Sequence, residues 1–340
     1  MTKKKALIAG INGQDGYFLT NFLNKKNYEI YGFSRSYKKI KLYNLPNKNF
    51  DIKFYKCDIT NEVELNKIIK EIKPHEIYNL ASQSRPSSSW KDEQETFQVN
   101  IFGAVNIFRA VLNNNINSKI FHASSSEMFG ASQKSLISEK SSMEAVNPYG
   151  ISKISAHNYC KIYRETYNLF ISTGIMFNHE SQLRPLDFLS QKITYGAACA
   201  KLNILNSKEL NEIGLPIVRN GYLELGNLNV KKDWGFAGDY IKCMWLMLQK
   251  NIPDDYIIGT GKLHSIKDMC KTAYESVGLD WKKYVKSNSD LKRVRETNNF
   301  CADVKMTFKK LNWKADTSFQ EMIKMMVLSN IDKLINQEQK

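Results

Sequence analysis

The stretch Lys5-ALIAGINGQDGYFLTNFLN-Lys25 decides the fold. An apolar run of strand length leads into a G-x-x-G-x-x-G turn, and apolar residues with helical spacing follow. Glycine lets a backbone approach a ligand closely, and N–H groups at a helix N-terminus attract anions. The stretch therefore predicts a strand, a pyrophosphate-binding turn and a helix near 15–26. The predicted dinucleotide contacts are Gly10, Gly13, Gln14, Asp15 and Gly16.

The alternation of strand and helix patterns continues through the first half of the chain. Further strands are predicted at 28–33, 52–56, 77–81, 120–124 and 171–177, with helices after 62 and at 93–113 and 149–167. Such alternation is typical of a parallel sheet. We predict an α/β fold: a Rossmann-type doubly wound parallel sheet in residues 1–178, to which parts of 225–260 return.

The second half of the chain is less regular. We expect a smaller, discontinuous C-terminal substrate-binding lobe, formed mainly by residues 179–340. Loops are predicted at 203–222 and 285–299, and the last two helices at 305–311 and 317–336. In open α/β sheets, ligands bind at the carboxyl ends of the strands, and a lobe there would cover them.

Composition excludes several classes of protein. With 340 residues, 42% of them hydrophobic, the chain can bury a sizeable core. No apolar run approaches the roughly 18 to 20 residues of a membrane span, so we predict a soluble, cytoplasmic protein with no membrane partner. The net charge of +15 comes from dispersed lysines and predicts no nucleic-acid partner. The six cysteines form no C-x-x-C pair, which predicts reduced thiols and no metal site.

The end of the second strand, Phe33-Ser-Arg-Ser36, indicates which dinucleotide binds. A site for NAD usually offers an acidic residue here to the ribose 2′-hydroxyl. Arg35 and Ser34 could instead hold a 2′-phosphate, which favours NADP, although Arg35 could also be merely exposed. Asp58, after the third strand, is predicted to contact the adenine edge, and its alternative role is that of a helix cap.

A catalytic pair is predicted in Tyr149-GIS-Lys153. Residues four apart on a helix share one face, and a neighbouring cation favours the phenolate that can take a hydroxyl proton. Upstream, Ala123-SSS-Glu127 follows a strand and offers a serine hydroxyl to the same substrate oxygen. The alternative is a surface Tyr and Lys that lie one turn apart by chance.

Together these motifs resemble the extended short-chain dehydrogenase/reductase superfamily, and longer stretches resemble one family within it, the GDP-mannose 4,6-dehydratases. Their order and spacing match that family along almost the whole chain. The stretches are Gly13-QDG-Tyr17, Glu76-IYNLASQ-Ser84, Ser124-SS-Glu127, Phe177-NHE-Ser181, Leu225-GN-Leu228 and Asp233-Trp-Gly235.

The resemblance implies a role for each matching residue. The implied catalytic residues are Ser125, Glu127, Tyr149 and Lys153, with Ser125 in place of the usual Thr. The further implied cofactor contacts are Leu80, Ser82, His179 and Arg184, beside Tyr149 and Lys153. The implied substrate contacts are Ser84, Ser125, Asn178, Lys192, Lys232, Arg293 and Glu296.

The chemistry of such a reaction explains the need for Glu127. The hydrogen on C5 of a hexose is not acidic, but it becomes so when C4 is transiently oxidised to a ketone. One carboxylate can then remove that proton and protonate the hydroxyl that departs from C6. The stored hydride returns to C6, so that NADP is regenerated. A simple dehydrogenase or epimerase does not need this carboxylate.

Departures from the family leave alternatives open. The stretch Ser181-QLR-Pro185 replaces the family's S-P-x-R-G, and Lys232 replaces an Arg. The substrate could therefore be another GDP-sugar, such as a GDP-heptose or an N-acetylated GDP-hexose. An NADP-dependent epimerase or reductase, or a non-catalytic NADP-binding protein, are further alternatives.

The expected quaternary state also follows from a departure. The family's Arg-rich loop, which supports tetramers, is replaced by Ser36-YKKIKLYNL-Pro46. We therefore predict a homodimer in which the helices at 93–113 and 149–167 of two chains pair as a four-helix bundle.

Overall fold

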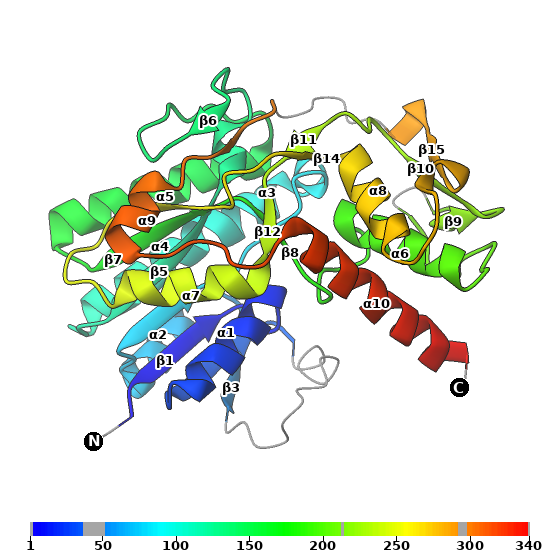
Figure 1. Cartoon of the computed structure of the whole chain (residues 1–340). Coiled ribbons are helices and arrows are strands. Elements are labelled where there is room, and N and C mark those ends of the chain that lie inside the picture. The colour runs from blue at the N-terminus through cyan, green and yellow to red at the C-terminus, as the bar shows by residue number, and fades with distance from the viewer. Residues whose placement is uncertain (1–2, 37–51, 212–213, 292–297, 339–340) are drawn as a thin grey trace. The chain divides into compact units, whose positions relative to one another are not determined.

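The computed structural model describes residues 3–36, 52–211, 214–291 and 298–338 (Figure 1). The chain divides into two compact units. Unit 1 comprises Met1–Phe177, Ala237–Ile258 and Ala302–Lys314, and unit 2 comprises Asn178–Phe236, Gly259–Cys301 and Ala315–Lys340. Each unit is assembled from three separate stretches of the chain.

Unit 1 contains a seven-stranded sheet whose neighbouring strands all run parallel, in the order β13-β7-β5-β4-β1-β2-β3. The chain builds outward from β1 to β3 and then returns to form β4 on the other side of β1. This reversal is the mark of a doubly wound sheet and confirms the predicted fold class. The strands are β1 (Lys5–Ala9), β2 (Glu29–Ser34), β3 (Ile52–Lys56), β4 (Glu76–Asn79), β5 (Lys119–Ser125), β7 (Ile171–Met176) and β13 (Asp255–Ile258).

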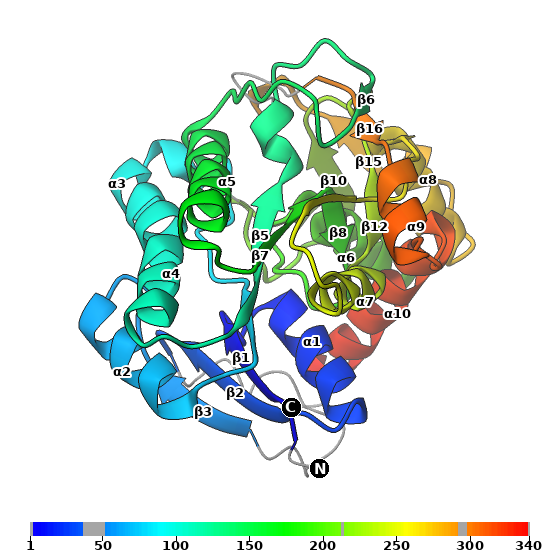
Figure 2. The ribbon, with the colours of Figure 1, turned by 90° about the vertical axis from the view of Figure 1, so that its left-hand side faces the viewer.

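Helices cover both faces of this sheet. Figure 2 shows α2, α3, α4 and α5 on one face and α1 and α7 on the other. The central strands are buried on both sides, and β1 is accordingly a continuous apolar run from Ala6 to Ala9, whereas the edge strand β3 is only partly buried. The helices of unit 1 are α1 (Gln14–Lys25), α2 (Glu62–Ile72), α3 (Glu93–Phe97), α4 (Gly103–Asn113), α5 (Pro148–Tyr167), α7 (Ala237–Leu248) and α9 (Lys305–Leu311). Its shorter elements are η1 (Ser88–Trp90), η3 (Ser126–Phe129) and β6 (Leu136–Ile137).

The helix predicted at 93–113 is not uniform. A π-helical segment, η2 (Gln98–Phe102), lies between α3 and α4. Such segments insert one residue per turn and frequently mark functional sites. Asn100, a buried polar residue, lies in this segment.

Unit 2 is built around three helices, α6 (Leu189–Lys201), α8 (Ile266–Glu275) and α10 (Phe319–Glu338), which pack against one another. Their apolar faces enclose a separate core that includes Ile193, Met269 and Met322. The remaining elements of this unit are β8 (Asn178–Glu180), β9 (Val218–Arg219), β10 (Tyr222–Leu225), β11 (Lys231–Lys232), β12 (Trp234–Phe236), β14 (His264–Ser265), η4 (Trp281–Lys283), β15 (Val285–Ser287) and η5 (Ser289–Leu291). Strand β16 (Cys301–Ala302) lies where the chain passes from unit 2 to unit 1.

Two predictions of loops are wrong in part. Strand β9 lies within 203–222, and β15 within 285–299. Both pair with β10, in a three-stranded sheet whose order is β15-β10-β9. Strand β15 is stabilised by a partner that is distant in sequence, so no local pattern predicts it. Strands β9 and β10 instead form a hairpin, and the Asn220-Gly221 turn that joins them is a local signal that the loop prediction did not use.

Three further properties concern the described residues as a whole. No helix among them is both long and apolar enough to cross a membrane. In the same part of the chain, no three His, Cys, Asp or Glu side chains gather in a group that could hold a metal ion. All six cysteines are unpaired, and five of them are buried.

Candidate active site

The Gly-rich turn joins β1 to α1 as the sequence predicts. Gly10 has a φ of +76°, and a Cβ there would lie 2.9 Å from the backbone N of Ala81. A Cβ on Gly16 would lie 2.3 Å from the carbonyl oxygen of Ile11. The first position requires a residue that tolerates positive φ, and the other requires one without a side chain, because the helix starts against the strand. Gly13 caps α1 with no side-chain oxygen, so the helix end is suited to an external anion.

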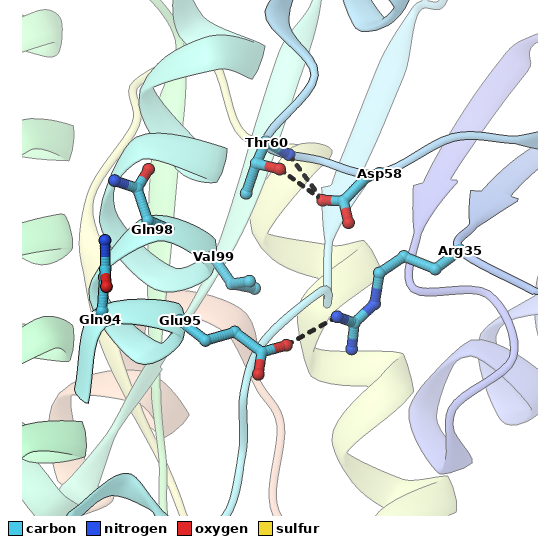
Figure 3. A pocket seen from close by; sticks show the side chains of 7 residues that line it. All are labelled: Arg35, Asp58, Thr60, Gln94, Glu95, Gln98 and Val99. Carbon is cyan, nitrogen blue, oxygen red and sulfur yellow. Dashed lines mark hydrogen bonds and ion pairs between the residues drawn. The ribbon is translucent and has the colours of Figure 1, made fainter. Parts of the chain in front are cut away.

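Arg35 and Asp58 line one pocket of about 400 Å³ (Figure 3). The other residues that line it are Thr60, Gln94, Glu95, Gln98 and Val99. Arg35 forms an ion pair with Glu95 across a distance of 2.7 Å. Asp58 Oδ1 accepts hydrogen bonds from both the amide and the hydroxyl of Thr60, as a turn residue before α2 does. The helix cap of α2 is Asn61, so the alternative role of Asp58 as a cap is wrong, and its contact with the adenine edge stays a prediction.

Tyr149 and Lys153 lie in the first turns of α5 and are both buried. Lys153 Nζ lies 5.6 Å from the centroid of the Tyr149 ring and donates a hydrogen bond of 2.9 Å to the carbonyl of Ala123. Burial lowers the pKa of Lys153 to about 8, so the ammonium form still predominates at pH 7. The Tyr149 amide donates to the hydroxyl of Ser89, which is itself fully buried.

Ser125 and Glu127 follow β5 and lie against the start of α5. The Ser125 hydroxyl accepts a hydrogen bond of 3.2 Å from the Glu127 amide. Glu127 Oε2 accepts one of 3.0 Å from the side-chain amide of Asn147, the residue that caps α5. A Cβ on Gly150 would lie 2.7 Å from the Glu127 carbonyl oxygen, so the helix start and the Glu127 turn are in direct contact. The structure thus brings together the predicted acid/base and the predicted redox pair.

The residues after β4 are held by Asn100. Its side chain accepts from the Ser82 hydroxyl and from the Gln83 amide, both at 2.9 Å. It also donates to the Ser152 hydroxyl on α5 at 2.9 Å. Leu80 and Ser82 are half-buried and Ser84 is exposed. Asn100 therefore fixes the segment after β4 relative to the helix of Tyr149.

In unit 2, two stretches that match the resemblance lie side by side. Strand β8 pairs in parallel with β12, with Asn178 opposite Trp234 and His179 opposite Gly235. Asp233, the residue before β12, is buried and accepts hydrogen bonds from the amides of Thr260 and Gly261. The stretches 177–181 and 233–235, more than fifty residues apart in sequence, thus form one structural feature.

The predicted cations of unit 2 differ in their surroundings. Arg184 Nε lies 3.2 Å from the buried carboxylate of Glu180, and its guanidinium stacks 3.7 Å above the Phe188 ring. Lys232 pairs with His264 between β11 and β14, and its Nζ lies 5.8 Å from the Phe300 ring. Lys192 is half-buried on α6. The predicted contacts Arg293 and Glu296 lie outside the described residues.

Comparisons with known proteins agree with these motifs. The family model described as GDP-mannose 4,6 dehydratase matches residues 7–326. The chain belongs to the GDP-mannose 4,6-dehydratase family. GDP-mannose 4,6 dehydratase 2 of Arabidopsis thaliana is 36% identical, over 97% of this chain and 87% of the relative. The GDP-mannose 4,6 dehydratase of Homo sapiens is 33% identical, over 96% of this chain and 91% of the relative.

Solved structures agree on the fold. The dTDP-glucose 4,6-dehydratase of Bacillus anthracis, in complex with NAD, matches with a TM-score of 0.81 and 18% identity, over 98% of each chain. RMD of Pseudomonas aeruginosa, complexed with NADPH, matches with a TM-score of 0.77 and 15% identity, over 97% of this chain and all of that one. At this identity the likeness concerns the fold alone.

The departures from the dehydratase family are local. Ser125 keeps the hydroxyl of the usual Thr and uses it to cap the Glu127 turn. Gln182 has a buried side-chain oxygen without a hydrogen-bond partner among the described residues, and its carbonyl accepts from Lys333 Nζ at 2.9 Å. The two positions at which this chain departs from the family's S-P-x-R-G stretch, Gln182 and Pro185, therefore lie in a partly buried loop of unit 2.

Three residues near the catalytic pair are absent from the predicted set: Ser89, Asn100 and Asn147. No motif marks Ser89 or Asn100, because both act through partners that are distant in sequence. Asn147 did carry a local signal, since an Asn directly before Pro-Tyr at a helix start is typical of an N-cap. Its second bond, to Glu127, is not predictable from that signal.

Proposed function

We propose that this chain is a nucleotide-sugar 4,6-dehydratase, a hydro-lyase that converts GDP-mannose to GDP-4-keto-6-deoxymannose. The observation that carries the proposal is the contact between the Glu127 turn and the start of the Tyr149 helix. A carboxylate beside the redox pair is what the elimination of water requires, and an epimerase has no use for it.

The described residues fit a nicotinamide dinucleotide. Gly10 and Gly16 lie where a Cβ would collide with backbone, and α1 begins without a side-chain cap. Both NAD and NADPH occupy solved structures of this fold. We propose NADP, because Arg35 lines a pocket beside the end of β2, where a 2′-phosphate would be held. When bound, the oxidised nicotinamide supplies the acceptor for a hydride from C4 and later returns it to C6.

The proposed roles of the catalytic residues in unit 1 follow from their positions. Tyr149 takes the proton of the substrate C4 hydroxyl, and the Lys153 ammonium favours the phenolate that does so. Ser125 orients the same substrate oxygen. Glu127 then takes the proton from C5, the electron pair forms the C5–C6 double bond, and the proton passes to the C6 oxygen, which leaves as water.

The substrate's nucleotide end is proposed to bind residues of unit 2. Asn178 and Lys192 would contact the pyrophosphate, and Arg293 with Glu296 would contact the guanine end. His179 and Arg184 would contact the dinucleotide, and Lys232 the substrate. These assignments rest on the family's motifs. The altered loop at 182–185 keeps a second candidate substrate in the same class, namely another GDP-sugar such as a GDP-heptose.

We also propose a homodimer and a cytoplasmic location. Exposed apolar side chains on the helices named for the interface support the dimer: Phe102 is 49% exposed, Ile151 50% and Ile162 51%. Large apolar side chains exposed on the two helices would be buried if two chains paired there. The unpaired cysteines are compatible with a reducing compartment.

Mass spectrometry of GDP-mannose incubated with the protein and NADP tests the proposal. Loss of one water, without net formation of NADPH, is the expected result. Glu127→Gln should still oxidise C4 but lose about 10²- to 10⁴-fold in water elimination, whereas Glu62→Gln, on the exposed first turn of α2, should behave as the wild type. A product of the same mass that separates from GDP-mannose by chromatography would favour an epimerase, and unreacted GDP-mannose alone would move the proposal to another GDP-sugar.

A further inference from the structure

Asn147 connects the predicted acid/base to the helix of the redox pair. Its side-chain oxygen accepts a hydrogen bond of 2.8 Å from the Gly150 amide, and its side-chain nitrogen donates one of 3.0 Å to Glu127 Oε2. Only one orientation of the amide satisfies both, because the Gly150 N–H is a donor and the carboxylate is an acceptor. The side chain is 8% exposed, so these two partners hold it in a largely enclosed position.

The second bond matters because Glu127 is otherwise weakly held. Within the described parts of the chain, no other group donates a hydrogen bond to its carboxylate. A glutamate side chain has three rotatable bonds, and ordering it has an entropic cost. Asn147 is the N-cap of α5, and this helix end packs directly against the Glu127 backbone. A Cβ on Gly150 would collide with the Glu127 carbonyl oxygen. The Asn147 side chain is therefore a rigid donor that fixes Oε2 of Glu127. The other carboxylate oxygen, Oε1, stays available to the substrate.

Helix capping alone does not explain an asparagine here. Asn, Asp and Ser cap helices about equally well, but only Asn combines the cap oxygen with a neutral N–H donor. Ser would leave the carboxylate without its donor, and Asp would place a second negative charge within about 3 Å of it. The residue type is thus matched to Glu127 as well as to the helix.

We propose that Asn147 is a positioning residue for Glu127 in the elimination of water. This inference rests on the proposed function. In the step concerned, the C5–H bond breaks and its proton goes to Glu127, the electron pair forms the C5–C6 double bond, and the C6–O bond breaks as oxygen takes that proton to leave as water. Asn147 holds the Glu127 carboxylate within reach of the C5 hydrogen and the C6 oxygen. Misplacement of that carboxylate by about 1 Å can slow such a step about 100-fold.

The test separates C4 oxidation from elimination in single turnovers with GDP-mannose and NADP. Quenching with borodeuteride converts any 4-keto sugar into a deuterated alcohol, and its mass shows whether water has already left. Asn147→Ser should slow elimination about 10-fold and Asn147→Asp about 100-fold. C4 oxidation should stay within about threefold of wild type in both, so that an undehydrated 4-keto sugar accumulates.

A matched control comes from α2. Asn61 caps that helix by the same pair of bonds, accepting from the Glu64 amide at 3.1 Å and donating to the Glu64 carboxylate at 3.3 Å. Asn61→Ser should leave both steps unchanged, while its melting temperature should change about as much as that of Asn147→Ser.

The outcomes are distinguishable. If oxidation and elimination slow together in Asn147→Ser, or if elimination keeps its wild-type rate, the positioning role is overturned although the proposed function stands. If the wild-type protein releases no water from any GDP-sugar, the proposed function itself fails.

Discussion

The guanidinium of Arg35 forms an ion pair with the carboxylate of Glu95, at a distance of 2.7 Å, and both residues line the pocket that Asp58 also lines (Figure 3). The side chain of Arg35 is 65% exposed and that of Glu95 is 48% exposed, so solvent screens their charges and the ion pair is weak. A 2′-phosphate that binds Arg35 must compete with this carboxylate. The proposed preference for NADP over NAD would therefore depend on Glu95 as well as on Arg35.

Replacement of Glu95 by Gln should strengthen the binding of NADP about three- to tenfold, because it removes a negative charge beside the proposed phosphate site. The affinity for NAD, which has no 2′-phosphate, should not change. Isothermal titration calorimetry with both dinucleotides measures the two affinities. Glu93→Gln, with the same charge change on the exposed side of α3, is the control and should alter neither. Equal gains for both dinucleotides would contradict a 2′-phosphate site at Arg35.

Replacement of Lys153 by Met should reduce turnover by about 10²- to 10⁴-fold, because the ammonium beside Tyr149 is lost. Its effect on stability should depend on pH. The pKa of Lys153 is about 8 in the folded chain and near 10.5 when unfolded, so the unfolded state binds more protons between these values. The free energy of unfolding of the wild type, relative to the variant, should therefore rise with pH across this range, by up to about 3 kcal/mol.

Urea denaturation of both proteins at several pH values between 7 and about 10.5 measures this difference. Below pH 8 the buried ammonium is a cost to the wild type, so the variant should be at least as stable there. A difference that does not vary with pH would show that Lys153 keeps an ordinary pKa.

Replacement of Gly10 by Ala should lower the free energy of unfolding by about 2–4 kcal/mol and abolish tight dinucleotide binding. Positive φ and the close approach of the Ala81 backbone both act at this position. Gly278→Ala is the matched control, since Gly278 has a φ of +79° but nothing within 4 Å of the added Cβ. It should cost about 1 kcal/mol, the strain alone. Urea denaturation measures both losses. Equal losses of unfolding free energy in the two variants would mean that the backbone near Ala81 shifts to accept the Cβ at position 10 without an energetic cost.

Replacement of Ile162 by Glu should convert the proposed dimer into monomers. Ile162 lies on the exposed face of α5, opposite the face that buries Lys153 and His157, so the charge should not disturb the fold. Light scattering coupled to size-exclusion chromatography measures the mass. The wild type should elute with the mass of two chains. A wild-type tetramer would contradict the proposed dimer, and a variant that keeps the mass of two chains would contradict the proposed interface.

The sequence predicted six of the seven strands in the sheet of unit 1, because their signals are local, but it named no strand at β13. Strand β1 is an apolar run that ends at a Gly-rich turn, β5 and β7 mix apolar residues with Ser, Thr or His, and the long helix α5 begins at a cap and a proline. Strand β9 was missed although Asn220-Gly221, which joins it to β10, is a typical hairpin turn, and β15 was missed because three residues carry no periodicity. The π-helical segment around Asn100 was missed as well, because one inserted residue leaves no pattern.

The candidate site shows the same division. Glycine spacing and the i, i+4 spacing of Tyr149 and Lys153 are properties of one continuous segment, and they were readable in the chain. The roles proposed for unit 2, at His179 and Arg184 for example, rest on the resemblance. The structure adds that Arg184 is paired with Glu180, a contact within one loop that no spacing rule singles out.

By itself, then, the sequence determined the elements and the chemical groups: the strand–turn–helix at Gly10, the face shared by Tyr149 and Lys153, and the carboxylate after β5. Only the tertiary structure decided which groups meet, namely Asn147 with Glu127, Arg35 with Glu95, and β8 with β12. The physical reason is that periodicity and capping act over a few residues, whereas a hydrogen bond between residues twenty or sixty apart depends on how the whole unit packs.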